Sequence, residues 1–108
     1  MKATELGDFE ELVLMTICVI GSDAYAVNVK SELEERLKKK INISAIHTAL
    51  YRLEDKGFLK SEIGGATKER GGRRKRLFTP TSAGKSALNR LKIVRERMYK
   101  LIPGLTNG

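Results

Sequence analysis

The residues best suited to chemistry are a run of cations that follows a pair of glycines. Residues 73–76 are Arg-Arg-Lys-Arg, directly after Gly71-Gly72. No hydrophobic core explains such a density of charge, whereas the phosphates of a nucleic-acid backbone do. The strongest candidates for contacts with phosphates or with a minor groove are therefore Arg73, Arg74 and Lys75.

The segment 43–56 is the second candidate for contact with a nucleic acid. It predicts a helix that begins with Ser44 as its N-cap and stops at Gly57. Its apolar residues form one narrow face. The residues of its first turn outside that face are small or hydrogen-bonding, as a helix entering a major groove requires. The residues predicted to face base edges and adjacent phosphates are Ser44, Ala45, His47 and Thr48.

For three side chains the sequence allows two alternative roles each. Arg52 either contacts phosphate or pairs with Glu54 or Asp55 on the same helix. Tyr25, at the start of the preceding helix, either contacts the nucleic-acid backbone or packs in the core. His47 either contacts the nucleic acid, with pH-dependent binding if it titrates near neutrality, or is an ordinary surface histidine.

Few residues of the chain can support catalysis or metal binding. One histidine, His47, and one cysteine, Cys18, exclude a zinc finger, an intrachain disulfide and a nucleophile–histidine–acid set. Residues 65–71 lack the lysine and hydroxyl that complete a phosphate-binding Walker loop. We therefore predict that the protein is not an enzyme and holds no cofactor or metal. Cys18 lies in an apolar segment, where thiols are usually inert.

The net charge indicates the same class of partner. The 108 residues allow one domain and carry 21 Lys and Arg against 13 Asp and Glu, a net charge of +8. A small, strongly basic domain usually binds a polyanion. Residues 1–43 carry a net charge of −2, whereas residues 44–76 and 77–108 carry +5 each. Such unevenness also arises by chance in small proteins, but here it coincides with the candidate contacts.

Hydrophobic periodicity and turn residues predict the elements that position these side chains. Helices are expected over residues 8–20, 24–40 and 44–56, strands over 58–63 and 73–79, and a last helix over 82–102. The expected N-caps are Asp8, Ser44 and either Thr81 or Ser82. The fold class is thus mainly α with a small β-hairpin. The hairpin must pack on the helices, because two strands alone are marginally stable.

Surplus apolar surface on the first and last helices predicts a homodimer. The first helix is apolar nearly all round, and the last helix repeats apolar residues with the 4-3-4-3 spacing of a coiled-coil seam. A helix packed on its own domain would show the same seam. We favour pairing between chains, because a dimer covers two such faces more easily. The predicted dimerisation residues are Phe9, Leu12, Ala87, Leu91, Val94, Met98 and Leu101.

No segment of the sequence predicts a membrane anchor. The apolar stretch Leu12–Ile20 is too short for a bilayer, which needs roughly 20 residues. It follows Asp8, Glu10 and Glu11 rather than the cations that precede a secretory signal. We therefore expect a soluble, cytoplasmic protein without membrane contacts.

Three helices followed by a two-stranded wing form the layout of a winged helix-turn-helix domain. We place this domain over residues 1–80, and a C-terminal dimerisation helix with its tail over residues 81–108. The residues resemble the PadR family of bacterial transcriptional regulators. The matching stretches are residues 6–10, 23–27, 44–57, 69–76 and 78–84, in the family's order. None is specific alone, but the ordered set is strong.

The resemblance implies a sequence-specific regulator of double-stranded DNA. The single C-terminal helix is similar to that of the short subfamily, whose members dimerise through it and often repress their targets. Such a dimer would bind a pseudo-palindromic operator. His47 departs from the tyrosine usual in the recognition helix, Ala26 from a glycine and Phe78 from a tyrosine. The first of these departures puts the DNA contact at His47 in doubt.

Two matters stay open at the level of sequence. The resemblance allows a small-molecule effector near Met15, Leu91 or Met98, although we favour the interpretation that these residues are plain core. The alternative function is a winged-helix module that binds RNA or another protein without operator specificity, because a basic wing does not by itself select DNA.

Overall fold

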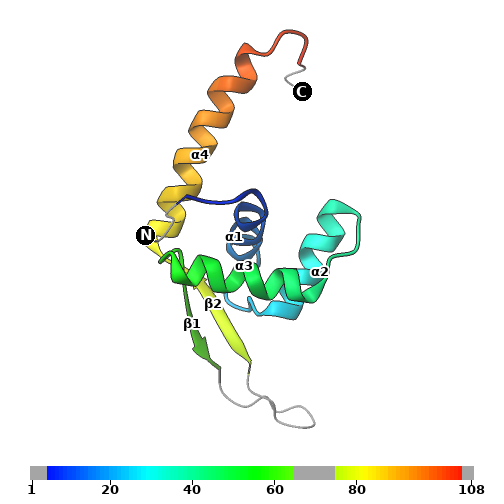
Figure 1. Ribbon diagram of the computed structural model, residues 1–108, viewed down its shortest axis with the longest axis vertical. Coiled ribbons are helices and arrows are strands. Elements are labelled where there is room, and N and C mark those ends of the chain that lie inside the picture. Colours follow the sequence, from blue (N-terminus) through cyan, green and yellow to red (C-terminus); the bar gives the residue numbers. More distant parts are fainter. Residues whose placement is uncertain (1–4, 65–74, 106–108) are drawn as a thin grey trace.

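The computed structural model describes residues 5–64 and 75–105 (Figure 1). Its helices are α1 (Asp8–Ile20), α2 (Ala26–Leu37), α3 (Ile43–Asp55) and α4 (Ser82–Leu101). Its strands are β1 (Leu59–Ile63) and β2 (Arg76–Pro80), and they form one antiparallel pair with Leu59 opposite Pro80. The predicted fold class, mainly α with a small hairpin, is confirmed.

One hydrophobic core joins the first three helices to the base of the hairpin. Its largest fully buried side chains include Leu14, Ile17, Ile46, Leu50 and Leu53. The hairpin adds Phe58, Leu59 and Phe78 to the same core. The Phe78 amide also donates to the Ala24 carbonyl at 2.9 Å, which ties β2 to the start of α2. The base of the wing is therefore held at a fixed place beside the helices.

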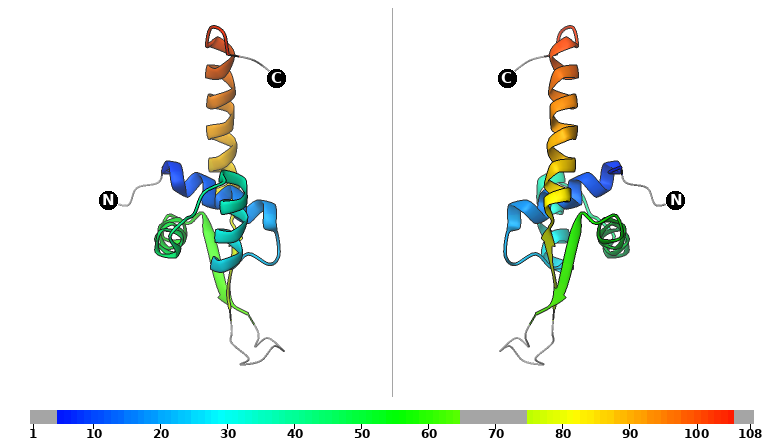
Figure 2. Two further views of the ribbon diagram at one scale, coloured as in Figure 1. Left: turned by 90° about the vertical axis from the view of Figure 1, so that its right-hand side faces the viewer. Right: turned by 90° about the vertical axis from the view of Figure 1, so that its left-hand side faces the viewer.

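α4 begins against this body and then leaves it, in the direction opposite to the hairpin (Figures 1 and 2). Thr81 Oγ1 accepts from the Gly84 amide at 3.0 Å and donates to the Gly57 carbonyl at 2.6 Å, so Thr81 is the N-cap. Gly84 and Ala87 are buried, and after Leu91 every residue of the helix is exposed. Only the first turns of α4 are thus covered by the chain itself.

Two of the predicted N-caps are wrong by one or two residues. α1 is capped at Gly7 rather than Asp8, because the Glu10 carboxylate reaches back and accepts from the Gly7 amide at 3.0 Å. α3 is capped by Asn42 rather than Ser44, because Asn42 Oδ1 accepts from the Ser44 amide at 2.9 Å. Ser44 therefore lies inside the first turn of α3.

α2 is shorter than its sequence predicts. It begins at Ala26 instead of residue 24 and ends at Leu37, because Lys38 adopts a left-handed conformation with φ of 57°. The Ile41 amide then donates to Glu34 Oε2 at 2.8 Å, which turns the chain back toward α3. The cations at residues 38–40 thus follow the helix rather than forming its last turn.

The strands are also shorter than expected. β1 begins at Leu59 rather than Phe58, and β2 begins at Arg76 rather than Arg73. Lys75 directly precedes β2, whereas Arg73 and Arg74 lie outside the described residues.

Candidate nucleic-acid interface

α3 turns its polar side to solvent. Its buried residues Ile46, Leu50 and Leu53 hold it against the core. The predicted contact residues of this helix all lie on the exposed side; they are Ser44, Ala45, His47, Thr48 and Arg52. The structure therefore brings together every α3 residue that the sequence analysis selected.

Tyr51 belongs to the same surface, but the sequence analysis did not select it. Its side chain is 74% exposed, the largest exposure among the aromatic residues described. It follows Ser44 by seven residues and Thr48 by three, spacings that return a helical residue to the same side. This spacing was the signal in the sequence that could have identified it.

A cleft separates α3 from the base of the wing. Its volume is about 410 Å³, and its lining includes Tyr25, His47, Tyr51, Lys75 and Phe78. The Lys75 ammonium lies 4.1 Å from the centre of the Tyr25 ring, within the range of a cation–π contact. Tyr25, the N-cap of α2, is half-buried, so part of the residue stays accessible to solvent. Three predicted contact residues, Tyr25, His47 and Lys75, therefore line the same cleft.

Two hydrogen bonds in series connect α3 to the hairpin of β1 and β2. Ser61 Oγ of β1 donates to Glu54 Oε2 of α3 at 2.6 Å, and Arg76 Nη1 of β2 donates to Ser61 Oγ at 3.0 Å. The bonds link three elements through side chains at the solvent boundary. They tie the hairpin to α3, and they engage Glu54, one of the two predicted partners of Arg52.

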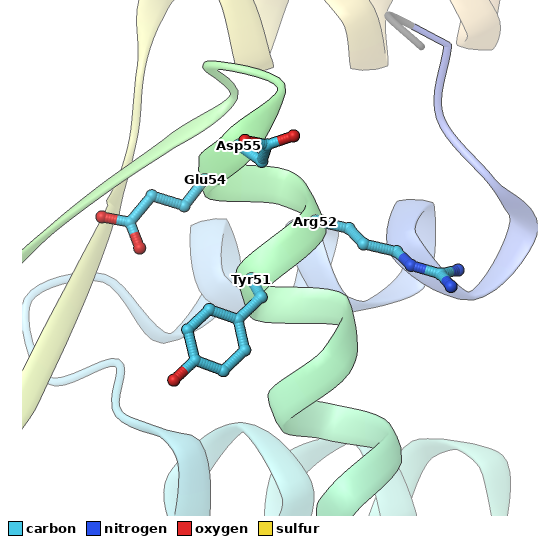
Figure 3. Close-up of a pocket in the computed structure, with 4 residues that line it drawn as sticks. All are labelled: Tyr51, Arg52, Glu54 and Asp55. Carbon is cyan, nitrogen blue, oxygen red and sulfur yellow. The ribbon is translucent and has the colours of Figure 1, made fainter. Parts of the chain in front are cut away.

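The C-terminal half of α3 carries an open hollow of about 640 Å³ beside Tyr51, Arg52, Glu54 and Asp55 (Figure 3). The four side chains diverge: Arg52 points to one side of the helix, and Tyr51 and Glu54 point to the other (Figure 3). Because they do not converge on a common point, the hollow is a feature of an exposed helix surface rather than an enclosed ligand site.

A nearly buried ion pair anchors the end of α3 to α1. Lys56 Nζ donates to Glu10 Oε1 at 2.5 Å and to the Glu5 carbonyl at 2.6 Å. Burial by itself raises the pKa of Glu10, but the hydrogen bonds from Lys56 and Gly7 and the charges of Lys56 and Arg52 outweigh it. The pKa of Glu10 therefore lies below the ordinary value for glutamate.

This ion pair makes the fold sensitive to acid. Because the pKa of Glu10 is lower in the folded chain than in the unfolded one, its ionisation stabilises the fold above about pH 4.3, and this contribution is lost as the pH falls through the folded-state pKa. We expect Glu10→Gln to lower the free energy of unfolding at neutral pH by about 1–2 kcal/mol, with a smaller further loss in acid than the unsubstituted protein shows.

Urea unfolding followed by circular dichroism between about pH 3 and pH 7 measures both effects. Glu62→Gln is the matched control, because Glu62 is an exposed glutamate on β1. An unfolding free energy that depends on pH equally in Glu10→Gln and in the unsubstituted protein would contradict the assignment.

The structure covers four of the predicted dimerisation residues at least in part and leaves the other three exposed. Phe9 and Leu12 of α1 are half-buried against the core, and Ala87 is a core residue. Leu91 is half-buried, whereas Val94, Met98 and Leu101 are exposed. Met15 and Met98 are exposed as well, so the expectation that they are plain core is wrong for the single chain.

The described residues offer little to metals, membranes or redox chemistry. No group of three or more His, Cys, Asp or Glu side chains among residues 5–64 and 75–105 could hold a metal ion. Within the same ranges, no helix has the length and apolar character to cross a membrane. Cys18 is exposed as a residue, but partial burial of its thiol raises the pKa of that thiol, so the reactive thiolate is disfavoured.

Comparison with known proteins identifies the family. Residues 14–90 match the family model described as "Transcriptional regulator PadR-like family", which is most of the chain. The chain belongs to the PadR-like family. The resemblance noted in the sequence is thus confirmed. No curated protein matches the chain with significant similarity.

Solved structures of PadR-like proteins share the fold. A PadR-like regulator from Bacillus cereus superposes with a TM-score of 0.72 at 15% identity, over 93% of this chain and 92% of that one. A PadR-like transcription factor from Bacteroides fragilis gives 0.68 at 17% identity, over 88% of each chain. PadR of Bacillus subtilis, solved in complex with operator DNA, gives 0.64 at 22% identity, over 80% of this chain and 47% of that one.

The PadR-like fold gives the elements of this chain their usual names. α2 and α3 are the helix-turn-helix pair, the hairpin of β1 and β2 is the wing, and α4 is the single C-terminal helix. The exposed side of α3, the cleft beside it and Lys75 at the base of the wing together form the candidate interface of this PadR-like regulator.

Proposed function

We propose that this PadR-like regulator binds double-stranded DNA in a sequence-specific manner, as a homodimer that represses its target genes. The observation that carries the proposal is the exposed side of α3 next to the wing base. Ser44, His47 and Thr48 are exposed on this helix, and His47 lines the same cleft as Lys75. A helix with small polar residues in its first turn and a cationic hairpin beside it fits a major groove and its flanking phosphates.

The residues of this surface divide between two tasks. Ser44, Ala45, His47 and Thr48 lie at the N-terminal half of α3, the part that reaches base edges in helix-turn-helix proteins. Lys75 and Arg52 flank them on opposite sides of α3 and serve phosphates, together with Arg73 and Arg74 of the wing. Tyr25 contributes to the backbone contact through the edge of its half-buried ring.

α4 supplies the dimer in this proposal. It projects away from the wing, so two copies can pair along α4 while both recognition helices stay accessible (Figure 1). A twofold dimer binds two half-sites about one helical turn of DNA apart, which makes the operator pseudo-palindromic. The proposal also includes a boundary at residue 80 between the DNA-binding domain and the dimerisation helix. It places the protein in the cytoplasm, where the chromosome lies. An effector site between Met15 and Met98 would form only in the dimer, because both are exposed in one chain.

The wing prediction has a direct test. We expect Arg73→Ala with Arg74→Ala to weaken binding to a duplex selected by the purified protein, and to reduce the dependence of log affinity on log salt. The physical reason is that each lost phosphate contact releases about one fewer counterion and lowers the slope by about one unit. Fluorescence anisotropy across a salt series measures both quantities.

Arg97→Ala with Lys100→Ala is the matched control, because it removes two cations from the end of α4 that lies away from the wing. An equal change of slope in the control would show a general charge effect and contradict the wing assignment. Competition with single strands and structured RNA tests the proposal as a whole. A preference for RNA, with no selectivity among duplex sequences, would favour the alternative winged-helix module.

A further inference from the structure

The outermost row of α3, opposite its buried face, carries three residues with hydroxyl groups. Ser44, Thr48 and Tyr51 follow one another at spacings of four and three residues, opposite the buried face of Ile46 and Leu53. All three are exposed. Figure 3 shows the Tyr51 ring extending from the helix, on the side opposite to Arg52. These are the side chains that a base edge would meet first.

The row lacks the groups that read guanine or adenine by paired hydrogen bonds. No Lys, Arg, Asn or Gln occurs between Ile43 and Tyr51, although these side chains make the usual bidentate contacts with purines. The first cation of the helix, Arg52, points toward α1, where its positive charge contributes to lowering the pKa of Glu10. Arg52 therefore points away from the row formed by Ser44, Thr48 and Tyr51, and its direction suits a phosphate beside the groove rather than a base edge within it.

Besides its hydroxyls, the row presents apolar groups. Thr48 offers a methyl group and Tyr51 an aromatic ring, with the Ala45 methyl at their side. The one hydroxyl proton of Ser44 is already donated to Asn42 Oδ1 at 2.7 Å. In the major groove, the only apolar group that a base pair displays is the C5-methyl group of thymine.

The charges of α3 favour contact with a duplex along residues 43–51 rather than along the last turn. The last turn of α3 carries Glu54 and Asp55, whose charges oppose phosphates, whereas residues 43–51 carry no acid. The helix dipole adds positive potential at the N-terminal end. Thr48 and Tyr51 both lie in this acid-free stretch.

We infer that Thr48 and Tyr51 are specificity-determining residues that read thymine. The Thr48 methyl and the Tyr51 ring pack against C5-methyl groups of thymines in each half-site. This inference rests on the proposed function, since it needs a duplex in contact with α3, and it names the base that the operator must offer there.

The test compares thymine with deoxyuridine, which lacks only the methyl group, in a duplex selected from random sequence by the purified protein. We expect one or two thymine positions in each half-site at which deoxyuridine weakens binding about fourfold, the value of one buried methyl group. Thr48→Ser, which removes the side-chain methyl and keeps the hydroxyl, and Tyr51→Ala should each abolish the effect at its own position. The comparison forms a double-mutant cycle between protein and base.

Ser86→Ala, a substitution of an exposed α4 residue, is the control and should keep the full sensitivity to deoxyuridine. The inference would be overturned if deoxyuridine left the binding affinity unchanged at every thymine of the selected site. It would also be overturned if deoxyuridine weakened binding equally in Thr48→Ser, Tyr51→Ala and the unsubstituted protein. If no duplex is selected at all, the proposed function itself has failed, and that outcome is seen before any thymine is replaced.

Discussion

Val94→Glu combined with Met98→Glu is expected to convert the proposed dimer to a monomer and to weaken binding to the proposed operator at least about 100-fold. Val94, Met98 and Leu101 are 49%, 61% and 81% exposed in the single chain, although they continue one apolar seam. Exposed apolar surface of this kind marks an interface. Two linked DNA-binding modules gain about 10² to 10⁴ in affinity over one, and the monomer forfeits that gain.

Sedimentation equilibrium measures the mass of the variant, and anisotropy with duplexes of one and two half-sites measures its affinity. Ser86→Glu with Asn89→Glu is the matched control, because it adds the same charge to exposed residues of α4 outside the seam. The control should remain a dimer. A dimeric Val94→Glu, Met98→Glu variant with normal affinity would show that α4 does not pair through this seam.

Gly84→Ala is expected to cause a large loss of stability, because Gly84 contacts the backbone of the body closely. A Cβ atom at Gly84 would lie 2.3 Å from the Phe58 carbonyl oxygen and 3.1 Å from its carbon. The obstacle is backbone at the entrance to β1, and the Thr81 amide donates to the same Phe58 carbonyl at 3.1 Å. Neither partner can rotate away, so the first turn of α4 must move off the body. We expect a loss of about 2–3 kcal/mol in the free energy of unfolding.

Thermal unfolding checks this value, since about 2–3 kcal/mol corresponds to a decrease in Tm of roughly 10–20 °C in a domain of this size. Ser86→Ala is the control, because Ser86 is exposed two residues later on the same helix. If Gly84→Ala unfolds at the temperature of the control, the close contact between α4 and β1 is not part of the folded protein in solution.

Much of the fold follows from local sequence signals. Apolar periodicity placed α1 and α4 within one residue of their observed bounds, because the apolar repeat of each helix extends over its whole length whether or not the chain itself covers it. The errors lie at the ends. Asn42 competes with Ser44 for the cap of α3, and Lys38 ends α2 early through a left-handed conformation. Which of several adjacent capping residues is used depends on contacts such as the bond between Ile41 and Glu34.

The sequence predicted the individual residues of the candidate interface only within α3. Ser44, Ala45, His47 and Thr48 share a side of α3 because helical spacing requires it. Tyr51 was not among the predicted contact residues, although its spacing from Ser44 and Thr48 places it on the same side of α3. The pairing of Lys75 with Tyr25, fifty residues earlier in the chain, was not predictable, because it requires the wing base to lie against the start of α2.

The sequence by itself determined the order of the elements, the fold class, the family resemblance and the likeness of one helix to a recognition helix. These depend on residue type and on spacing along the chain, which folding does not alter. Only the tertiary structure decided how the seam of α4 is used: Ala87 is buried in the core of its own chain, whereas Val94, Met98 and Leu101 are left exposed. A periodic apolar row is the same in both cases. The close approach of Gly84 to Phe58 sets the direction in which α4 leaves the body, and that direction determines where the seam stops being covered.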